Sequence, residues 1–441
     1  MARFRGPLIS ADSHVVEEPR LWLDRIDRRY RHLAPRVVDV GDTDLWLVGT
    51  DDRRLPVTPP AAPPTQKGPG RPFRELDDDA LGDVHGGGDT DGGPNPDDVR
   101  IHAMGIHAQA GRRYAPGARI SKRQRLADRG DFSPEAYLAG LTVDGVAGAV
   151  LYPSVGLGAY QVVPSWLFTP IARTYNDWLL REFCAHAPDR LKGAAMINVD
   201  DIDAALAEMT RTAQLGSACF LFPVDPAPGQ RYDDRRFEPL WSAAAELGLP
   251  VMLHLQAMRS IYGRAPVFDL LRHTSGVVHL HLSLAAMSLS GVFARHPGLR
   301  VGAVEWGGSW VPYLLERIDA AYRADHGRTV ARLADGALPS DHLRRALFVI
   351  FQEDAAALAL RDQIGIERLL WGNDYPHAES TFPRSREILA AQLDQVASED
   401  AARFTFTNAA ERFGFVLERL VASKRRSPQL KEQATPGMLS L

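Results

Sequence analysis

Residues 299–308 read LRVGAVEWGG, a short apolar run that closes on a glutamate and two glycines. Apolar residues at helical spacing precede this run at 282–296 and follow it at 310–323. A short buried strand flanked by helices of about 10–15 residues is typical of βαβ units, which build parallel sheets. This stretch therefore predicts one repeating unit of an α/β protein.

The same alternation of short apolar runs and helical patterns extends through most of the chain. We expect eight strands, at 7–11, 146–152, 191–199, 217–222, 250–255, 299–305, 346–351 and 368–371. Helices are expected at 166–186, 200–215, 236–247, 282–296, 310–323, 354–364 and 385–396. Eight such units predict a (β/α)₈ TIM barrel. A doubly wound open sheet is the alternative, weakened because no glycine-rich dinucleotide fingerprint follows any strand.

The barrel is expected to comprise residues 1–40 and 131–422, with a long insertion after the first strand. A hairpin is expected within 36–57, around Asp44. Further along, the insertion at 41–130 holds Pro-Pro pairs and an acidic, glycine-rich run, a composition that buries little apolar surface. We expect it to be partly flexible and to lie over the barrel mouth. Residues 423–441 are expected to form a flexible tail.

Composition narrows the function classes. The chain has 441 residues and a formal net charge of −4, which argues against a strongly basic nucleic-acid binder. It has no run of 18 apolar residues and no secretory signal, so we expect a cytoplasmic protein without a membrane partner. Cys184 and Cys219 fit no disulfide framework or zinc-finger spacing, and we expect buried thiols.

Polar residues stand where four of the predicted strands end. Asp12 and His14 follow the first strand and, two residues apart, point the same way in an extended segment. His254 ends the fifth strand, Glu305 the sixth, and Asp374 follows the eighth. The carboxyl ends of barrel strands carry the catalytic residues of this architecture, so these side chains predict one shared site.

The order of these motifs resembles a known family. The segments are Asp12-Ser13-His14, HLQ at 254–256, FARHPGLRVGAVEWGGSWVPYLLERID at 293–319 and WGNDYPH at 371–377. Together they are similar to the amidohydrolase-2 family of the amidohydrolase superfamily, which includes aminocarboxymuconate-semialdehyde decarboxylase. The resemblance implies a mononuclear metal at the barrel mouth, with Asp12, His14, His254 and Asp374 as ligands. The family often places a catalytic histidine before a Gly-Gly pair after the sixth strand, where this chain has Glu305.

The chemistry of these residues agrees with a metal site. Two carboxylates and two imidazoles neutralise a doubly charged cation and leave a position open for water or substrate. This mixture of oxygen and nitrogen donors favours Zn²⁺, with Mn²⁺ or Fe²⁺ as alternatives.

We expect a metal-dependent enzyme that hydrolyses a small ester, lactone or amide with a metal-activated water. Asp374, Glu305 and His254 are the expected catalytic groups. The alternative is nonoxidative decarboxylation of an aromatic or unsaturated carboxylic acid. A non-catalytic barrel that acts as a binding partner, and a metal-free lactonase-type barrel, also stay open.

His377, Gln256 and Trp306 are the expected substrate-binding residues, with Trp306 as a wall of the pocket. The expected partner is a small-molecule substrate rather than nucleic acid. The resemblance also implies a homodimer.

Overall fold

The computed structural model describes residues 6–40, 43–48, 133–162, 165–259, 271, 273–328, 333, 336–377 and 379–420. Its centre is an eight-stranded parallel sheet in the order β1-β4-β5-β6-β7-β8-β9-β10. The strands are β1 (Ile9–Val15), β4 (Gly148–Pro153), β5 (Leu191–Met196), β6 (Cys219–Phe222), β7 (Val251–His254), β8 (Val301–Val304), β9 (Leu347–Phe351) and β10 (Leu369–Trp371).

The sheet closes on itself where its first and last strands meet. Just beyond β10, the Asp374 N–H donates to the Asp12 carbonyl oxygen at 2.9 Å. The His14 N–H donates to the Tyr375 carbonyl oxygen at 2.7 Å. These bonds join β1 to the segment after β10 and complete a barrel. The predicted (β/α)₈ fold is therefore confirmed, and the open-sheet alternative is not needed.

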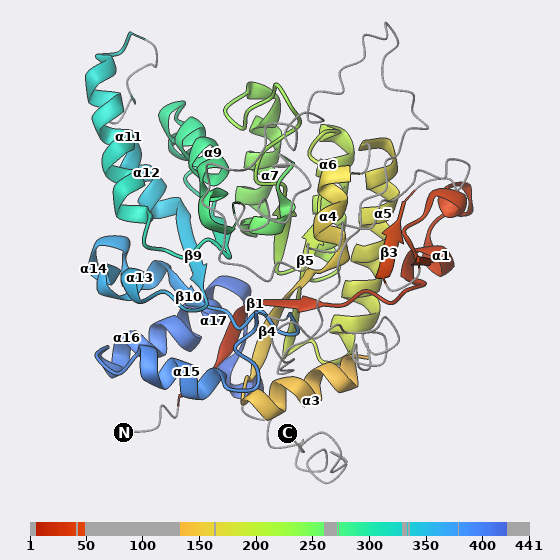
Figure 1. Ribbon diagram of the computed structural model, residues 1–441. Helices are drawn as coiled ribbons and strands as arrows, with labels where there is room; N and C mark the ends of the chain where they lie inside the picture. The colour runs from red at the N-terminus through yellow and green to blue at the C-terminus, as the bar shows by residue number, and fades with distance from the viewer. Residues whose placement is uncertain are drawn as a thin grey trace, which may run out of the picture.

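Helices surround the barrel (Figure 1). In chain order they are α1 (Leu21–Arg25), α3 (Pro134–Asp144), α4 (Val155–Val162), α5 (Ser165–Trp178), α6 (Ile202–Gln214), α7 (Glu238–Leu247), α9 (Val277–Leu289), α10 (Val292–Arg295), α11 (Val311–Asp325), α12 (Pro339–Ala346), α13 (Ala355–Ala359), α14 (Arg361–Ile364), α15 (Ser385–Gln392), α16 (Ser398–Ala402) and α17 (Asn408–Phe413). Single π turns at Leu179–Phe183 and Arg403–Thr407 extend α5 and α16.

The barrel interior is filled by side chains. Every residue of β4, β6, β7, β8, β9 and β10 is buried. Gly302 on β8 shows how tight the filling is, because a Cβ there would collide with the side chains of Met252 and Phe348. Any site must therefore lie at a barrel end rather than along its axis.

All eight predicted strands are present, with some differences at their ends. β1 continues through Val15, four residues beyond its predicted end, because Asp12, Ser13 and His14 are buried rather than part of a loop. The helix predicted at 282–296 begins earlier, at Val277, and breaks at Gly291. The one predicted at 354–364 is two short helices, α13 and α14.

The predicted hairpin is present as β2 (Arg36–Val40) paired antiparallel with β3 (Thr43–Leu47). The rest of the insertion predicted at 41–130, and the tail at 423–441, lie outside the described residues. Cys184 and Cys219 are buried free thiols, as expected.

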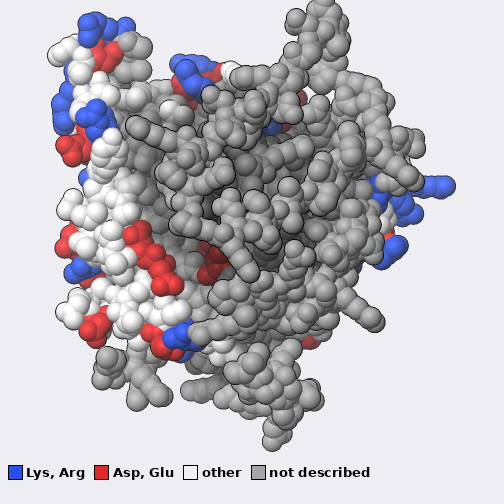
Figure 2. All heavy atoms as spheres, in the orientation of Figure 1, with Lys and Arg blue, Asp and Glu red and all other residues white. Residues whose placement is uncertain are grey.

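In the described part of the chain, no helix combines the length and apolar character needed to cross a membrane. Figure 2 shows Lys, Arg, Asp and Glu interspersed on the described part of one face, without a broad basic surface.

Candidate metal centre

Five of the predicted residues converge at the carboxyl ends of four strands. Asp12 and His14 project from β1, His254 is the last residue of β7, Glu305 follows β8, and Asp374 follows β10. Strand order places β7 beside β8 and closure places β1 beside β10, so the barrel brings the two pairs together across its mouth.

The His14 imidazole lies at the centre of this group. Its Nε2 lies 3.6 Å from Asp12 Oδ1, 3.6 Å from Glu305 Oε1 and 3.3 Å from Asp374 Oδ1. Its Nδ1 lies 2.9 Å from the Pro153 carbonyl oxygen, which can only accept a hydrogen bond. Nδ1 therefore carries the proton, and the Nε2 lone pair faces the carboxylates. This arrangement is usual for histidines that ligate metals.

His254 completes the group from the other side. Its Nε2 lies 3.3 Å from His14 Nε2 and 3.6 Å from Asp12 Oδ1. Its Nδ1 lies 3.4 Å from both Glu305 Oε2 and the backbone N–H of Gln256. The Gln256 N–H donates to Nδ1, and Nε2 is the ring nitrogen that faces His14 and Asp12.

The backbone is strained at two of the carboxylates. Three non-glycine residues in the described chain have positive φ, and two of them are Glu305, at 66°, and Asp374, at 55°. Such conformations cost free energy and cluster at functional sites, where the surrounding structure fixes them. The backbone bond from Asp374 to Asp12 is one such constraint.

A histidine and a serine form a chain of polar contacts that begins at the Asp374 carboxylate. His377 Nδ1 lies 2.8 Å from Asp374 Oδ1, and its Nε2 lies 2.9 Å from the hydroxyl of Ser154, just after β4. The same hydroxyl donates to the Val15 carbonyl oxygen at 2.8 Å. The His377 ring also stacks on His14, with centroids 3.9 Å apart. The orientation of Asp374 is therefore tied to β4 through His377.

Burial and neighbouring charges shift the pKa values of three residues of the site. Burial, reinforced by His377 and His254, holds the pKa of His14 well below its usual value, so the imidazole is neutral. Burial raises the pKa of Asp374, which His377 opposes. For His377, burial lowers the pKa, but the Asp374 carboxylate outweighs this and the net shift is upward.

The donor set fits a divalent cation. Asp12 Oδ1 is buried and accepts no hydrogen bond from the described residues. Donor atoms of Asp12, His14, His254 and Glu305 all lie within 4.8 Å of one another, as do those of His14, Glu305, Asp374 and His377. Ligands on opposite sides of one ion at about 2.2 Å lie roughly 4.4 Å apart, so the spacings within each set suit one ion. Asp12 and His254 belong to one set, Asp374 belongs to the other, and His14 and Glu305 belong to both.

A cavity of about 240 Å³ opens beside this group. Its walls include five of the predicted site residues: Asp12, Gln256, Glu305, Asp374 and His377. Trp306 is not among the lining residues, and its indole N–H donates to the Leu253 carbonyl oxygen on β7 at 2.9 Å.

Some residues at the cavity were not predicted from the sequence. They are Ser154, which holds His377, and the lining residues His273, Gln352, Glu353 and Glu379. Gln352 and Glu353 directly follow β9, and Ser154 follows β4, so reading the ends of the second and seventh strands would have found them.

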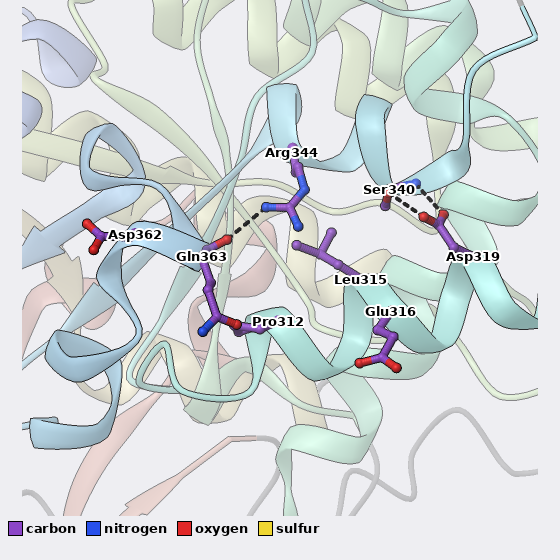
Figure 3. Close-up of a pocket in the computed structure, with 8 residues that line it drawn as sticks. All are labelled: Pro312, Leu315, Glu316, Asp319, Ser340, Arg344, Asp362 and Gln363. Carbon is purple, nitrogen blue, oxygen red and sulfur yellow. Dashed lines mark hydrogen bonds between the residues drawn. The ribbon is translucent and has the colours of Figure 1, made fainter.

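A second, larger cavity lies away from the mouth, between α11, α12 and α14. Its volume is about 410 Å³. Figure 3 shows Ser340 bonded to Asp319 and Arg344 reaching the Gln363 carbonyl oxygen. The clusters of metal-type donors found in the described chain lie elsewhere.

Comparisons with known proteins agree with this architecture. A family model described as amidohydrolase matches residues 98–415. Gamma-resorcylate decarboxylase of Rhodococcus jostii is 29% identical over 278 residues, spanning 55% of this chain and 76% of that protein.

Two solved structures show the same fold. An amidohydrolase from Mycobacterium avium subsp. paratuberculosis superposes with a TM-score of 0.67 at 21% identity, over 93% of this chain and all of that chain. A 5-carboxyvanillate decarboxylase from Novosphingobium aromaticivorans, with bound manganese and 3-methoxy-4-hydroxy-5-nitrobenzoic acid, gives 0.56 at 19% identity, over 66% and 84% of the two chains.

The fold and the donors at its mouth define a TIM-barrel enzyme with a candidate divalent-metal site. The family match covers well over half of the chain, and the chain belongs to the amidohydrolase family, as the sequence motifs predicted.

Proposed function

We propose that this protein is a metal-dependent, nonoxidative decarboxylase of a small aromatic carboxylic acid. The observation that carries the proposal is the meeting of two imidazoles and three carboxylates beside a cavity of about 240 Å³. Among similar proteins of this family, the gamma-resorcylate decarboxylase matches over most of its length. This supports decarboxylation, the alternative expected from the sequence, more than the hydrolysis that was the leading expectation.

The metal ligands in this proposal are Asp12, His14, His254 and Asp374. When bound, a divalent cation there would anchor the substrate carboxylate and an adjacent oxygen and draw electron density from them. The sequence favoured Zn²⁺, but oxygen-rich donor sets also suit Mn²⁺, and a structural neighbour contains manganese. We therefore propose Mn²⁺ as the first ion to test.

Decarboxylation breaks the bond between the ring carbon and the carboxyl carbon. CO₂ leaves, the electron pair stays on the ring carbon, and that carbon takes up one proton. Asp374 lines the cavity, and its Oδ1 faces His377 Nδ1 at 2.8 Å. We assign proton delivery to Asp374, with His377 behind it as the group that resupplies the proton.

The rest of the cavity would orient the ring. Gln256 offers its amide group for substrate hydroxyls, and Leu255 and Ile350 offer apolar contact. Gln352 Nε2 already donates to the Glu379 carbonyl oxygen, so Gln352 offers its amide oxygen. Trp306 would act through the position of the turn after β8 rather than by touching the substrate.

The test is a substrate panel with the metal-loaded enzyme. Hydroxylated benzoic acids would be incubated with enzyme and Mn²⁺, and CO₂ release would be measured beside ester, lactone and amide hydrolysis. We expect CO₂ from at least one aromatic acid and, in D₂O, one deuterium at the carbon that lost the carboxyl group. Turnover of an ester, lactone or amide without CO₂ from any acid would overturn the proposal in favour of hydrolysis.

Other sequence expectations remain proposals. We propose that the 41–130 insertion covers the mouth and sets substrate range, so its deletion would change that range while the circular-dichroism signal of the barrel persists. A homodimer, tested by light scattering, and a cytoplasmic location are likewise proposed.

A further inference from the structure

Glu305 occupies a position where the family resemblance leads one to expect a histidine. It follows β8 directly, and 16% of its side chain is exposed. A glutamate differs from a histidine by its negative charge and its two oxygen donors, so this exchange changes what the site can bind.

Both oxygens of Glu305 face the imidazoles of the site. Oε1 lies 3.6 Å from His14 Nε2, and Oε2 lies 3.4 Å from His254 Nδ1. Two sets of donors in the described chain could hold an ion, and Glu305 and His14 belong to both. Adjacent ligands of a single ion, each at about 2.2 Å, lie roughly 3 Å apart, so the carboxylate is within reach of such an ion.

The turn that presents Glu305 is held firmly. Its φ of 66° is unfavourable for a residue with a side chain. On one side, Trp306 anchors the turn to the Leu253 carbonyl oxygen. On the other, Asp354 Oδ2 accepts the Gly308 N–H at 2.8 Å. Gly307 is required between them, because a Cβ there would lie 2.6 Å from Asp354 Oδ2. Strain maintained by surrounding bonds indicates a position under functional constraint.

We propose that Glu305 is a direct ligand of the metal ion and the fifth protein donor beside Asp12, His14, His254 and Asp374. Three carboxylates and two imidazoles exceed the four donors of a tetrahedral zinc site. They match an ion that takes more ligands, many of them oxygen, so Glu305 biases this site toward Mn²⁺ over Zn²⁺. The inference rests on the metal site of the proposed function but not on the reaction.

The experiment measures metal binding directly. Metal-free wild type, Glu305→Gln, Glu305→Asp and Asp362→Asn would be titrated with Mn²⁺ and with Zn²⁺ by calorimetry. Their Co²⁺ forms would be compared by visible absorption, which reports coordination number. Glu305→Asp keeps the charge but withdraws the oxygens by one methylene. Asp362→Asn removes the same charge from an exposed residue at the other cavity, outside both donor sets.

We expect both Glu305 variants to bind Mn²⁺ more weakly by at least about 10- to 100-fold, the range for groups that only support a site. Zn²⁺ affinity should fall less, and the Co²⁺ spectrum should intensify as a ligand is lost. Asp362→Asn should match wild type.

Two results would overturn the inference. Wild-type affinity and an unchanged Co²⁺ spectrum in Glu305→Gln would place the carboxylate outside the coordination sphere. Wild-type Mn²⁺ affinity in Glu305→Asp would show that only the charge matters.

A folding defect is separable from these effects. Metal-free Glu305→Gln should melt at or above the wild-type temperature, because a like charge has been removed from the cluster. A wild type that binds no ion would instead end the proposed function, and this inference with it. A wild type that binds Mn²⁺ but releases no CO₂ would end the proposed reaction alone.

Discussion

Two cavities in this molecule contain carboxylates, and they differ in what those carboxylates contact. In the cavity between α11, α12 and α14, Asp319 accepts hydrogen bonds from the Ser340 N–H at 3.1 Å and its hydroxyl at 2.7 Å. At the barrel mouth, Asp12 Oδ1 is buried and accepts none from the described residues. The cavity that contains Asp319 is the larger of the two, at about 410 Å³ against 240 Å³. A buried carboxylate oxygen that accepts no hydrogen bond, rather than the volume of the cavity, therefore marks the candidate site.

The largest effect is expected at Asp374. Asp374→Asn keeps the shape of the side chain but removes the group assigned to proton delivery. Activity at saturating metal should fall by about 100- to 10,000-fold, the usual worth of a positioned acid or base. The rate of CO₂ release measures this. The matched change Asp362→Asn, at the other cavity, should leave the rate unchanged. Equal rates for Asp374→Asn and Asp362→Asn would show that the carboxylate at the barrel mouth matters no more for activity than the one at the other cavity.

Stability should respond in the opposite way. Asp319→Ala leaves the Ser340 groups without their acceptor and should lower the free energy of unfolding by about 1–3 kcal/mol. Asp12→Asn, measured without metal, should cost little or nothing, because it relieves repulsion within the cluster. Urea unfolding of the metal-free proteins tests both. A larger loss for Asp12→Asn than for Asp319→Ala would contradict the account.

A smaller effect on activity is expected at Ser154. Ser154→Ala removes the hydroxyl that holds His377 Nε2, while His377 keeps its contact with Asp374. We expect kcat to fall by about tenfold, with KM and metal content nearly unchanged, as for other groups that orient metal ligands without binding the metal. His377→Ala should fall further. Loss of metal in Ser154→Ala would mean that the hydroxyl supports the fold rather than the orientation of His377.

The smallest effect concerns Glu17, a buried carboxylate that is satisfied without a cation. It accepts backbone N–H groups of Ser154, Val155 and Gly156. Burial nevertheless raises its pKa above the ordinary 4.5. The folded protein therefore binds this proton more tightly than the unfolded chain does. The free energy of unfolding should fall as the pH rises from 4.5 through the raised pKa.

Glu17→Gln should remove this part of the pH dependence. Each unit between the folded and unfolded pKa is worth about 1.4 kcal/mol. Denaturant unfolding of both proteins across this pH range measures the difference. Parallel curves for wild type and variant would show that Glu17 titrates normally.

The barrel could be predicted from the sequence because its strands are apolar runs separated by helical patterns. The rule failed where polar residues are buried. β1 was predicted to end at Ala11, since the apolar run gives way there to the polar residues Asp12, Ser13 and His14. α9 was predicted to start at Leu282, because His279 and His281 obscure the apolar periodicity of its first turns.

The main site residues could be predicted because each follows a strand. The sequence does not show which residues from distant segments contact them in the folded chain. Ser154 and His377 are 223 residues apart, and only closure of the barrel brings them within 2.9 Å. The positive φ of Glu305 and Asp374 is equally invisible in a sequence, since neither residue type usually requires that conformation.

The mouth of the barrel is proposed to hold one divalent metal ion. Metal content by mass spectrometry, on tag-free wild type, His254→Ala and Asp319→Ala, tests it most directly. We predict about one divalent ion per chain in wild type and Asp319→Ala, and its loss in His254→Ala. Metal-free wild type, even after incubation with Mn²⁺ or Zn²⁺, would contradict the account.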